Sequence, residues 1–104
     1  MVNTPLKEDP DDSGGTVHVL IVDDEKAARY GMVKALRPDG YHLTEAEDAL
    51  SGLNLLNNNT YDVVITDVTM PGMNGIDFLR KIREKKFESF VIVITAHGSG
   101  KLAV

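Results

Sequence analysis

Three acidic side chains and one hydroxyl follow apolar runs that have the length of β-strands. Asp23 and Asp24 come after residues 17–22, Asp67 after residues 63–66, and Thr95 after residues 90–94. Val and Ile dominate these runs, and helix-like stretches separate them, which is typical of parallel strands buried on both faces. Because parallel strands bring their carboxyl ends to one edge of a sheet, we expect these four residues to meet there.

Three carboxylates in one place repel one another and resist ionisation unless a cation holds them. Mg²⁺ prefers such oxygen ligands, and a carboxylate can attack phosphorus to form an aspartyl-phosphate. A neighbouring hydroxyl can hydrogen-bond a phosphoryl oxygen. The residue types therefore point to metal-dependent phosphoryl transfer.

Each of these residues alone also has a structural interpretation. Asp is a favoured helix N-cap, and Thr is common in strands. Capping, however, needs only one of the adjacent Asp23 and Asp24, and a loop rather than a helix follows Asp67 directly. The joint pattern favours a functional site.

The elements that must position these residues alternate along the chain. The pattern predicts strands over about 16–22, 41–45, 62–66 and 90–95, and helices over about 25–36, 48–56 and 76–83. Such alternation is typical of βαβ units with right-handed crossovers, so the predicted fold class is α/β, with a doubly wound parallel sheet.

Local signals support the predicted helices. The helix over 25–36 should place Ala28, Met32, Ala35 and Leu36 on one face. Asp48 is a plausible N-cap for the next helix. Glycines at positions 72 and 75 should let the loop after Asp67 bend without Cβ clashes.

Composition limits the class of protein. The chain has 104 residues, a net charge of −5 and no Cys, which fits one domain without disulfides or thiolate metal sites. Its apolar runs are far shorter than the ~20 residues of a membrane span. We expect a disordered acidic tail over 1–15, one domain over 16–104, a cytoplasmic location and no membrane association.

A cluster of basic residues lies near the end of the third predicted helix. Cations are favoured at a helix C-terminus by its dipole, and no aromatic platform for stacking bases accompanies them. We therefore expect no direct contact with nucleic acid. The cluster consists of Arg80, Lys81, Arg83, Lys85 and Lys86.

Three segments together resemble the receiver domain of two-component response regulators. They are Val-Asp-Asp-Glu (22–25), Asp-Val-Val-Ile-Thr-Asp-Val-Thr-Met-Pro-Gly-Met-Asn-Gly (62–75) and Val-Ile-Val-Ile-Thr-Ala-His-Gly (91–98). The intervals between the acidic positions and Thr95 also agree with that family. The last segment is similar to receivers of the nitrogen-regulator type. The resemblance implies a flavodoxin-like sheet in the order 2-1-3-4-5.

The resemblance also implies a role for each site residue. Asp67 would accept a phosphoryl group from a sensor histidine kinase, with Mg²⁺ or Mn²⁺ as the cofactor. Asp24 and Asp67 would bind the metal directly, Asp23 through water, and Thr69 through its backbone carbonyl. Thr95 would be the switch hydroxyl. The chain would be a signalling phospho-acceptor, not an enzyme beyond its own phosphorylation and dephosphorylation.

The sequence departs from the family pattern at its end. We expect an incomplete sheet with four strands and about three helices, because the fifth strand, its Lys and the last helix are missing. Lys101 lies too soon after Thr95 to replace that Lys. A truncated receiver of this kind would be part of a longer regulator with an output domain, or a piece of one. It would expose its fourth strand and self-associate through that edge or by swapping an element.

Two other functions remain open from the sequence. The missing Lys favours a degenerate receiver that binds a kinase or partner without being phosphorylated. A phosphohydrolase of the haloacid-dehalogenase type also uses a strand-end Asp, Mg²⁺ and a strand-end Thr. Those enzymes usually have an acid where Thr69 stands, and their nucleophile follows the first strand.

Overall fold

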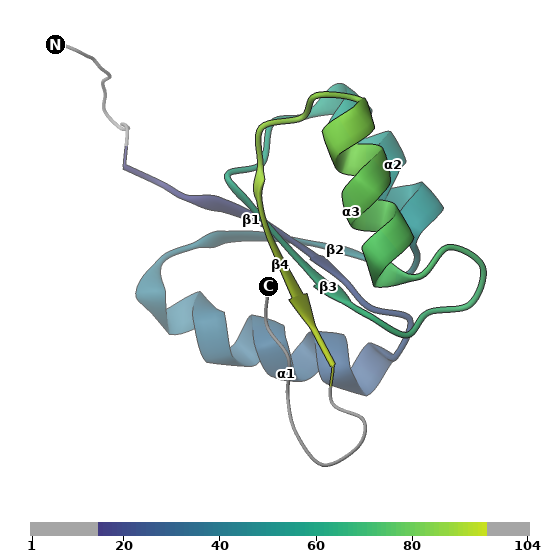
Figure 1. Cartoon of the computed structure of the whole chain (residues 1–104). Helices are drawn as coiled ribbons and strands as arrows, with labels where there is room; N and C mark the ends of the chain where they lie inside the picture. Colours follow the sequence, from purple (N-terminus) through teal and green to yellow (C-terminus); the bar gives the residue numbers. More distant parts are fainter. Residues whose placement is uncertain (1–14, 96–104) are drawn as a thin grey trace, which may run out of the picture.

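One parallel sheet and three helices make up the computed structural model, which describes residues 15–95 (Figure 1). The strands are β1 (His18–Val22), β2 (His42–Ala46), β3 (Val63–Asp67) and β4 (Phe90–Ile94). The helices are α1 (Lys26–Leu36), α2 (Ala49–Asn58) and α3 (Gly75–Glu84), with a short 3₁₀ helix η1 (Arg37–Asp39) after α1. The strand order is β2-β1-β3-β4, so the predicted doubly wound α/β sheet is confirmed.

The helices cover the two faces of the sheet unequally. Helix α1 lies on one face, while α2 and α3 lie side by side on the other (Figure 1). Because successive side chains of a strand point to opposite faces, every buried strand supplies both layers. This explains why β1, β3 and β4 consist mostly of Val, Ile and Leu.

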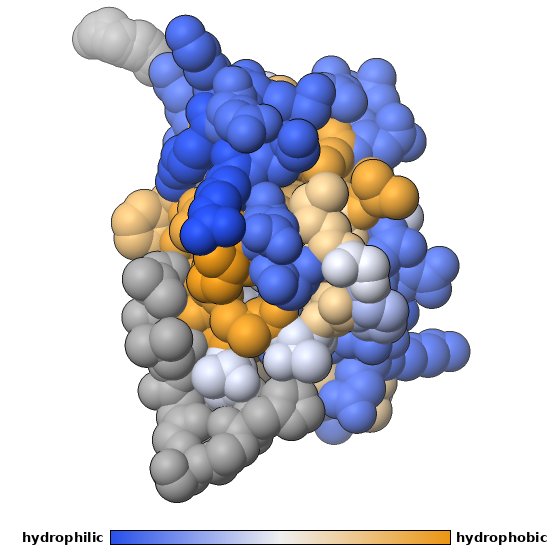
Figure 2. Space-filling view, turned by 45° about the vertical axis from the view of Figure 1, so that its right-hand side comes forward, coloured by the Kyte–Doolittle hydropathy of each residue, from blue (hydrophilic) through white to orange (hydrophobic). Residues whose placement is uncertain are grey.

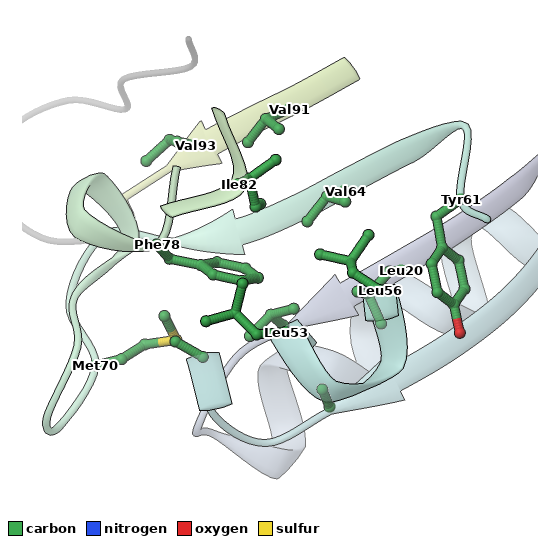
Figure 3. Packing of buried hydrophobic residues seen from close by; sticks show 13 residues of the cluster. Leu20, Leu53, Leu56, Tyr61, Val64, Met70, Phe78, Ile82, Val91 and Val93 are labelled. Carbon is green, nitrogen blue, oxygen red and sulfur yellow. The ribbon is translucent and has the colours of Figure 1, made fainter. Parts of the chain in front are cut away.

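The larger hydrophobic core lies between the sheet and the α2–α3 layer (Figure 3). Phe78 and Ile82 from α3 and Leu53 and Leu56 from α2 point toward Val64 on β3. The buried members of this core are Leu20, Val22, Ala46, Ala49, Leu53, Leu56, Tyr61, Val64, Met70, Phe78, Ile82, Val91 and Val93.

The second core, under α1, is much smaller. Its buried members are Val19, Ile21 and Val33, with Met32 and Leu36 partly buried beside them. The predicted helix face was wrong in one respect. The buried residue of α1 is Val33. Ala35, two residues further along and hence on the other side of the helix, is exposed.

Side-chain caps begin two of the helices. The Asp48 carboxylate accepts a hydrogen bond from the Ser51 backbone N–H at 2.8 Å, which confirms the predicted cap of α2. Asn74 caps α3 in the same way through the N–H of Asp77. The N-cap of α1 is Glu25, which makes no side-chain capping bond. None of these helices is long and apolar enough to cross a membrane.

Among residues 15–95, β4 pairs only with β3 and forms one edge of the sheet. The first residue of this strand, Phe90, is 66% exposed, and Ile92 and Ile94 are half-buried. Figure 2 shows apolar residues gathered on one face of the molecule and bounded by hydrophilic side chains.

Candidate functional site

Three carboxylates meet at the carboxyl edge of the sheet. Asp23 and Asp24 directly follow β1, and Asp67 is the last residue of the neighbouring strand β3. One oxygen from each of the three side chains lies within 4.8 Å of the other two. Asp23 and Asp67 are only 4% and 9% exposed, whereas Asp24 is open to solvent. Two of the three charges are therefore held away from water.

Local hydrogen bonds fix Asp23 in this position. Its backbone N–H donates to the carbonyl of Ala46 at the end of β2, and its carboxylate accepts from the N–H of Glu25 at 2.9 Å. The bond from the Glu25 N–H to the Asp23 carboxylate closes an Asx turn; Asp23 is not the N-cap of α1. Burial raises the pKa of Asp23; the Glu25 N–H opposes this, and the charges of Asp67 and Asp24 add to the rise.

These residues fit a hard divalent cation. Each offers a carboxylate oxygen, the ligand type that Mg²⁺ prefers. Within residues 15–95 the acids that form ion pairs are Glu45, Asp77 and Glu84, so no described Lys or Arg neutralises the cluster. A bound cation would lower the cost of keeping three carboxylates ionised in so small a volume.

Thr95 lies beside this edge. Asp67 is paired with Ile94 in the sheet register, and the N–H of Val68 donates to the carbonyl of Ile94 at 2.8 Å. Thr95, the next residue, is half-buried and makes an interaction of its own. The backbone thus brings the hydroxyl-bearing residue to the end of the strand that adjoins Asp67.

The structure leaves some of the predicted features untested. Thr69 lies in the exposed loop two residues after Asp67, and metal binding by its carbonyl stays a prediction. Residues 1–14 of the predicted tail over 1–15, and Lys101, lie outside the described residues.

Gly75 has a role that the sequence did not reveal. A Cβ at this position would lie 2.2 Å from the carbonyl oxygen of Asp67 and 2.9 Å from the Cα of Val68. The Gly75 N–H also donates to the Val68 carbonyl at 2.8 Å. The first turn of α3 therefore rests directly on the backbone of Asp67. Gly72, by contrast, has a φ of +76° and meets the expectation of a bend.

A cavity lies at the opposite edge of the sheet, where the strands begin. It measures about 620 Å³ and is lined by residues 56–62 and 86–89, which precede β3 and β4. The carboxylate cluster lies instead where the strands end, with Asp24 as its exposed member.

Comparison with known proteins adds the family. Residues 19–104 match the model described as "Response regulator receiver domain". The response regulator MprA of Mycobacterium sp. (strain KMS) is 35% identical over 83 residues, which cover 80% of this chain and 36% of MprA. The transcriptional regulatory protein FixJ of Bradyrhizobium diazoefficiens is 31% identical over 87 residues, covering 84% of this chain and 42% of FixJ.

A solved structure shows the same fold. The response regulator protein TrrA of Thermotoga maritima, determined in complex with Mg²⁺ and BeF, superposes with a TM-score of 0.75 at 34% identity. The match covers 80% of this chain and 72% of that one. The chain spans less than half the length of the two curated relatives. With its parallel sheet and strand-end carboxylates, this chain belongs to the response regulator receiver domain family.

Proposed function

We propose that the domain accepts a phosphoryl group on Asp67 from the phosphohistidine of a sensor histidine kinase, with Mg²⁺ as cofactor. The observation that supports this most strongly is the convergence of three carboxylates within 4.8 Å at the sheet edge. Membership of the receiver family supports the same reaction.

Asp67 is the best nucleophile of the three acids. One carboxylate oxygen of Asp23 is engaged by the Glu25 N–H, and Asp24 is exposed on the loop after β1. Asp67 ends a central strand, and its backbone is fixed by β4 on one side and by Gly75 on another. Such fixation holds the carboxylate in one orientation toward an incoming phosphorus atom.

In the transfer, an Asp67 oxygen forms a bond to phosphorus as the P–N bond of the donor breaks. The imidazole leaves with the electron pair of that bond, and the product is an acyl phosphate on Asp67. Bound Mg²⁺ supplies positive charge for the phosphoryl oxygens. Asp24 and Asp67 would hold it directly, Asp23 through water, and Thr69 through its backbone carbonyl.

Thr95 would respond to the modification. Its place after the residue paired with Asp67 suits a hydroxyl that hydrogen-bonds a phosphoryl oxygen once one is present. The domain would then act as a signalling acceptor, and any catalysis would be limited to its own phosphorylation and dephosphorylation.

Intact-mass spectrometry tests the acceptor role. After incubation with Mg²⁺ and acetyl phosphate, the wild-type protein should gain one phosphoryl group, and Asp67→Asn should gain none. Asp39→Asn removes an exposed carboxylate from η1, away from the cluster, and is the matched control. A folded wild type that gains no mass and does not bind beryllium fluoride with Mg²⁺ would contradict the proposal and favour a binding-only receiver.

We also propose that the domain is part of a longer chain that carries an output domain, and that it associates with itself through β4. The relatives are more than twice as long as the matched region, which supports the first point. The unpaired outer edge of β4 in the described structure and the exposure of Phe90 support the second.

A further inference from the structure

Arg29 of α1 joins two strands across the carboxyl edge of the sheet. Its Nη1 donates a hydrogen bond to the backbone carbonyl of Asp23, at the end of β1. Its Nε donates to Oε1 of Glu45 on β2 at 3.2 Å. The Arg29 side chain is only 13% exposed, although it carries a full charge. A guanidinium this well buried is held by both acceptors together.

The carbonyl that Arg29 contacts belongs to the peptide bond between Asp23 and Asp24. The plane of that peptide contains the N and Cα of Asp24, so holding it restricts where the Asp24 side chain can lie. The N–H of Asp23, in the preceding peptide, is fixed by the carbonyl of Ala46, and its carboxylate by the N–H of Glu25. Of the contacts that fix this turn, the one from Arg29 is the most direct on the Asp23–Asp24 peptide.

We propose that Arg29 is a positioning residue for the metal site. It holds the Asp23–Asp24 peptide so that both carboxylates face Asp67, and Glu45 holds Arg29 in turn. This inference rests on the proposed Mg²⁺ site at the same cluster. Arg29 donates its hydrogen bonds to the Asp23 carbonyl and to Glu45, and not to a carboxylate of the cluster. All three carboxylates therefore stay available to the cation.

The geometry requires a guanidinium rather than any cation. Nε and Nη1 are held in one plane and donate in two directions, to the carbonyl of Asp23 and to Glu45. A Lys ammonium is a single point at the end of a flexible stem, so it does not reproduce this two-way contact. Arg29→Lys therefore retains the charge and loses the positioning.

Calorimetric titration with Mg²⁺ alone, on the full chain far below its unfolding temperature, tests the inference. We expect Arg29→Met to bind Mg²⁺ about 10-fold more weakly than the wild type, a typical cost of losing an outer-shell partner. Arg29→Lys should recover only part of that affinity. Arg80→Met is the matched control, because it removes an exposed Arg that is paired with Asp77 on α3. The control should bind as the wild type does.

Several results would overturn the inference. A folded Arg29→Met protein with wild-type affinity would do so, and full recovery in Arg29→Lys would show that charge alone matters. If Arg29→Met does not fold, Glu45→Gln decides, since the Glu45 side chain is half exposed. Glu45→Gln should weaken Mg²⁺ binding by less than 10-fold. Unchanged affinity would overturn the inference that Glu45 and Arg29 position the metal site. A wild type that binds no Mg²⁺ contradicts instead the proposed function.

Discussion

The first turn of α3 touches the proposed phospho-acceptor through a contact between Gly75 and Asp67. A methyl group on Gly75 would come within 2.2 Å of the Asp67 carbonyl oxygen, a backbone atom that has no freedom to rotate away. The loop after β3 and the start of α3 therefore depend on a residue without a side chain. Any larger residue has to move either the helix or the end of the strand.

Gly75→Ala should consequently destabilise the protein by about 1–3 kcal/mol, the usual cost of overpacking. It should also reduce phosphorylation by acetyl phosphate, because Asp67 shifts with its backbone. Urea unfolding measures the first effect and intact-mass spectrometry the second. Gly31→Ala is the control. Gly31 is exposed within α1 and has open space around its Cα, so this change should increase the free energy of unfolding by about 1 kcal/mol. Equal stability of Gly75→Ala and the wild type would show that the contact relaxes freely.

Asp48 should give the protein a pH-dependent stability. The Ser51 N–H, followed by its hydroxyl, lowers the pKa of Asp48. The stabilisation is therefore complete above the unfolded-state pKa of about 3.9 and is lost as the pH falls through the lower folded-state value. Asp48→Ala should cost about 1 kcal/mol at neutral pH.

The matched variant Asp48→Asn separates charge from capping, because Asn is an equally good N-cap. We expect its stability to equal that of the wild type within a few tenths of a kcal/mol at neutral pH, without the decline on acidification that Asp48 causes. Chemical unfolding at a series of pH values gives the comparison. Parallel curves for the two proteins would mean that the Asp48 carboxylate does not titrate with folding.

Removing one charge from the cluster should stabilise the metal-free protein. The pKa of Asp23 is raised by burial and by its neighbours, so ionised Asp23 destabilises the fold at pH values above its folded-state pKa. In the presence of a chelator, Asp23→Asn should be more stable than the wild type at pH 7, and the difference should shrink as the pH falls. The amide oxygen can still accept from the Glu25 N–H.

Added Mg²⁺ should reverse that order. Binding to the folded state at a concentration of 100 Kd contributes about 2.7 kcal/mol to the wild type, and Asp23→Asn should gain less because it has lost a ligand charge. Thermal unfolding with and without Mg²⁺ measures how much the metal stabilises each of the two proteins. A variant that gains as much as the wild type would show that Asp23 takes no part in binding the metal.

Phe90→Lys should reduce self-association. Phe90 is the first residue of β4 and is 66% exposed at the edge of the sheet. A Lys there places a charge on the edge and discourages pairing with another chain. Light scattering over a range of concentrations measures the change. Leu50→Lys, at a 71% exposed position on α2, is the control and should leave the association as it is. A wild type that is monomeric throughout would contradict the proposed association.

The positions of the acids could be predicted because they depend on one general property. Parallel strands end at a common edge, so the ends of the apolar runs place Asp23 and Asp67 near each other whatever the loops do. The Asp48 cap could also be predicted, because it is a local contact with a partner only three residues away.

Contacts that depend on how side chains of separate elements pack could not be predicted. Arg29 is an ordinary helix residue in the sequence, and only the fold brings it to the Asp23 carbonyl and to Glu45. The sequence explained Gly75 by backbone freedom, whereas the structure explains it by the closeness of Asp67. Likewise, the buried residue of α1 is Val33, whereas Ala35, which the sequence placed on the buried face, is exposed.

The unequal cores on the two faces of the sheet have a consequence for dynamics. Helix α1 has a single buried residue, Val33, while α2 and α3 share the large core. Local opening costs least where few apolar contacts are lost, so backbone amides of α1 should exchange with deuterium before those of α3. Because α1 bears Arg29, such openings would release the turn at Asp23 while the central strands stay protected. Occupation of the carboxylate cluster would then slow exchange in a helix that contributes no ligand.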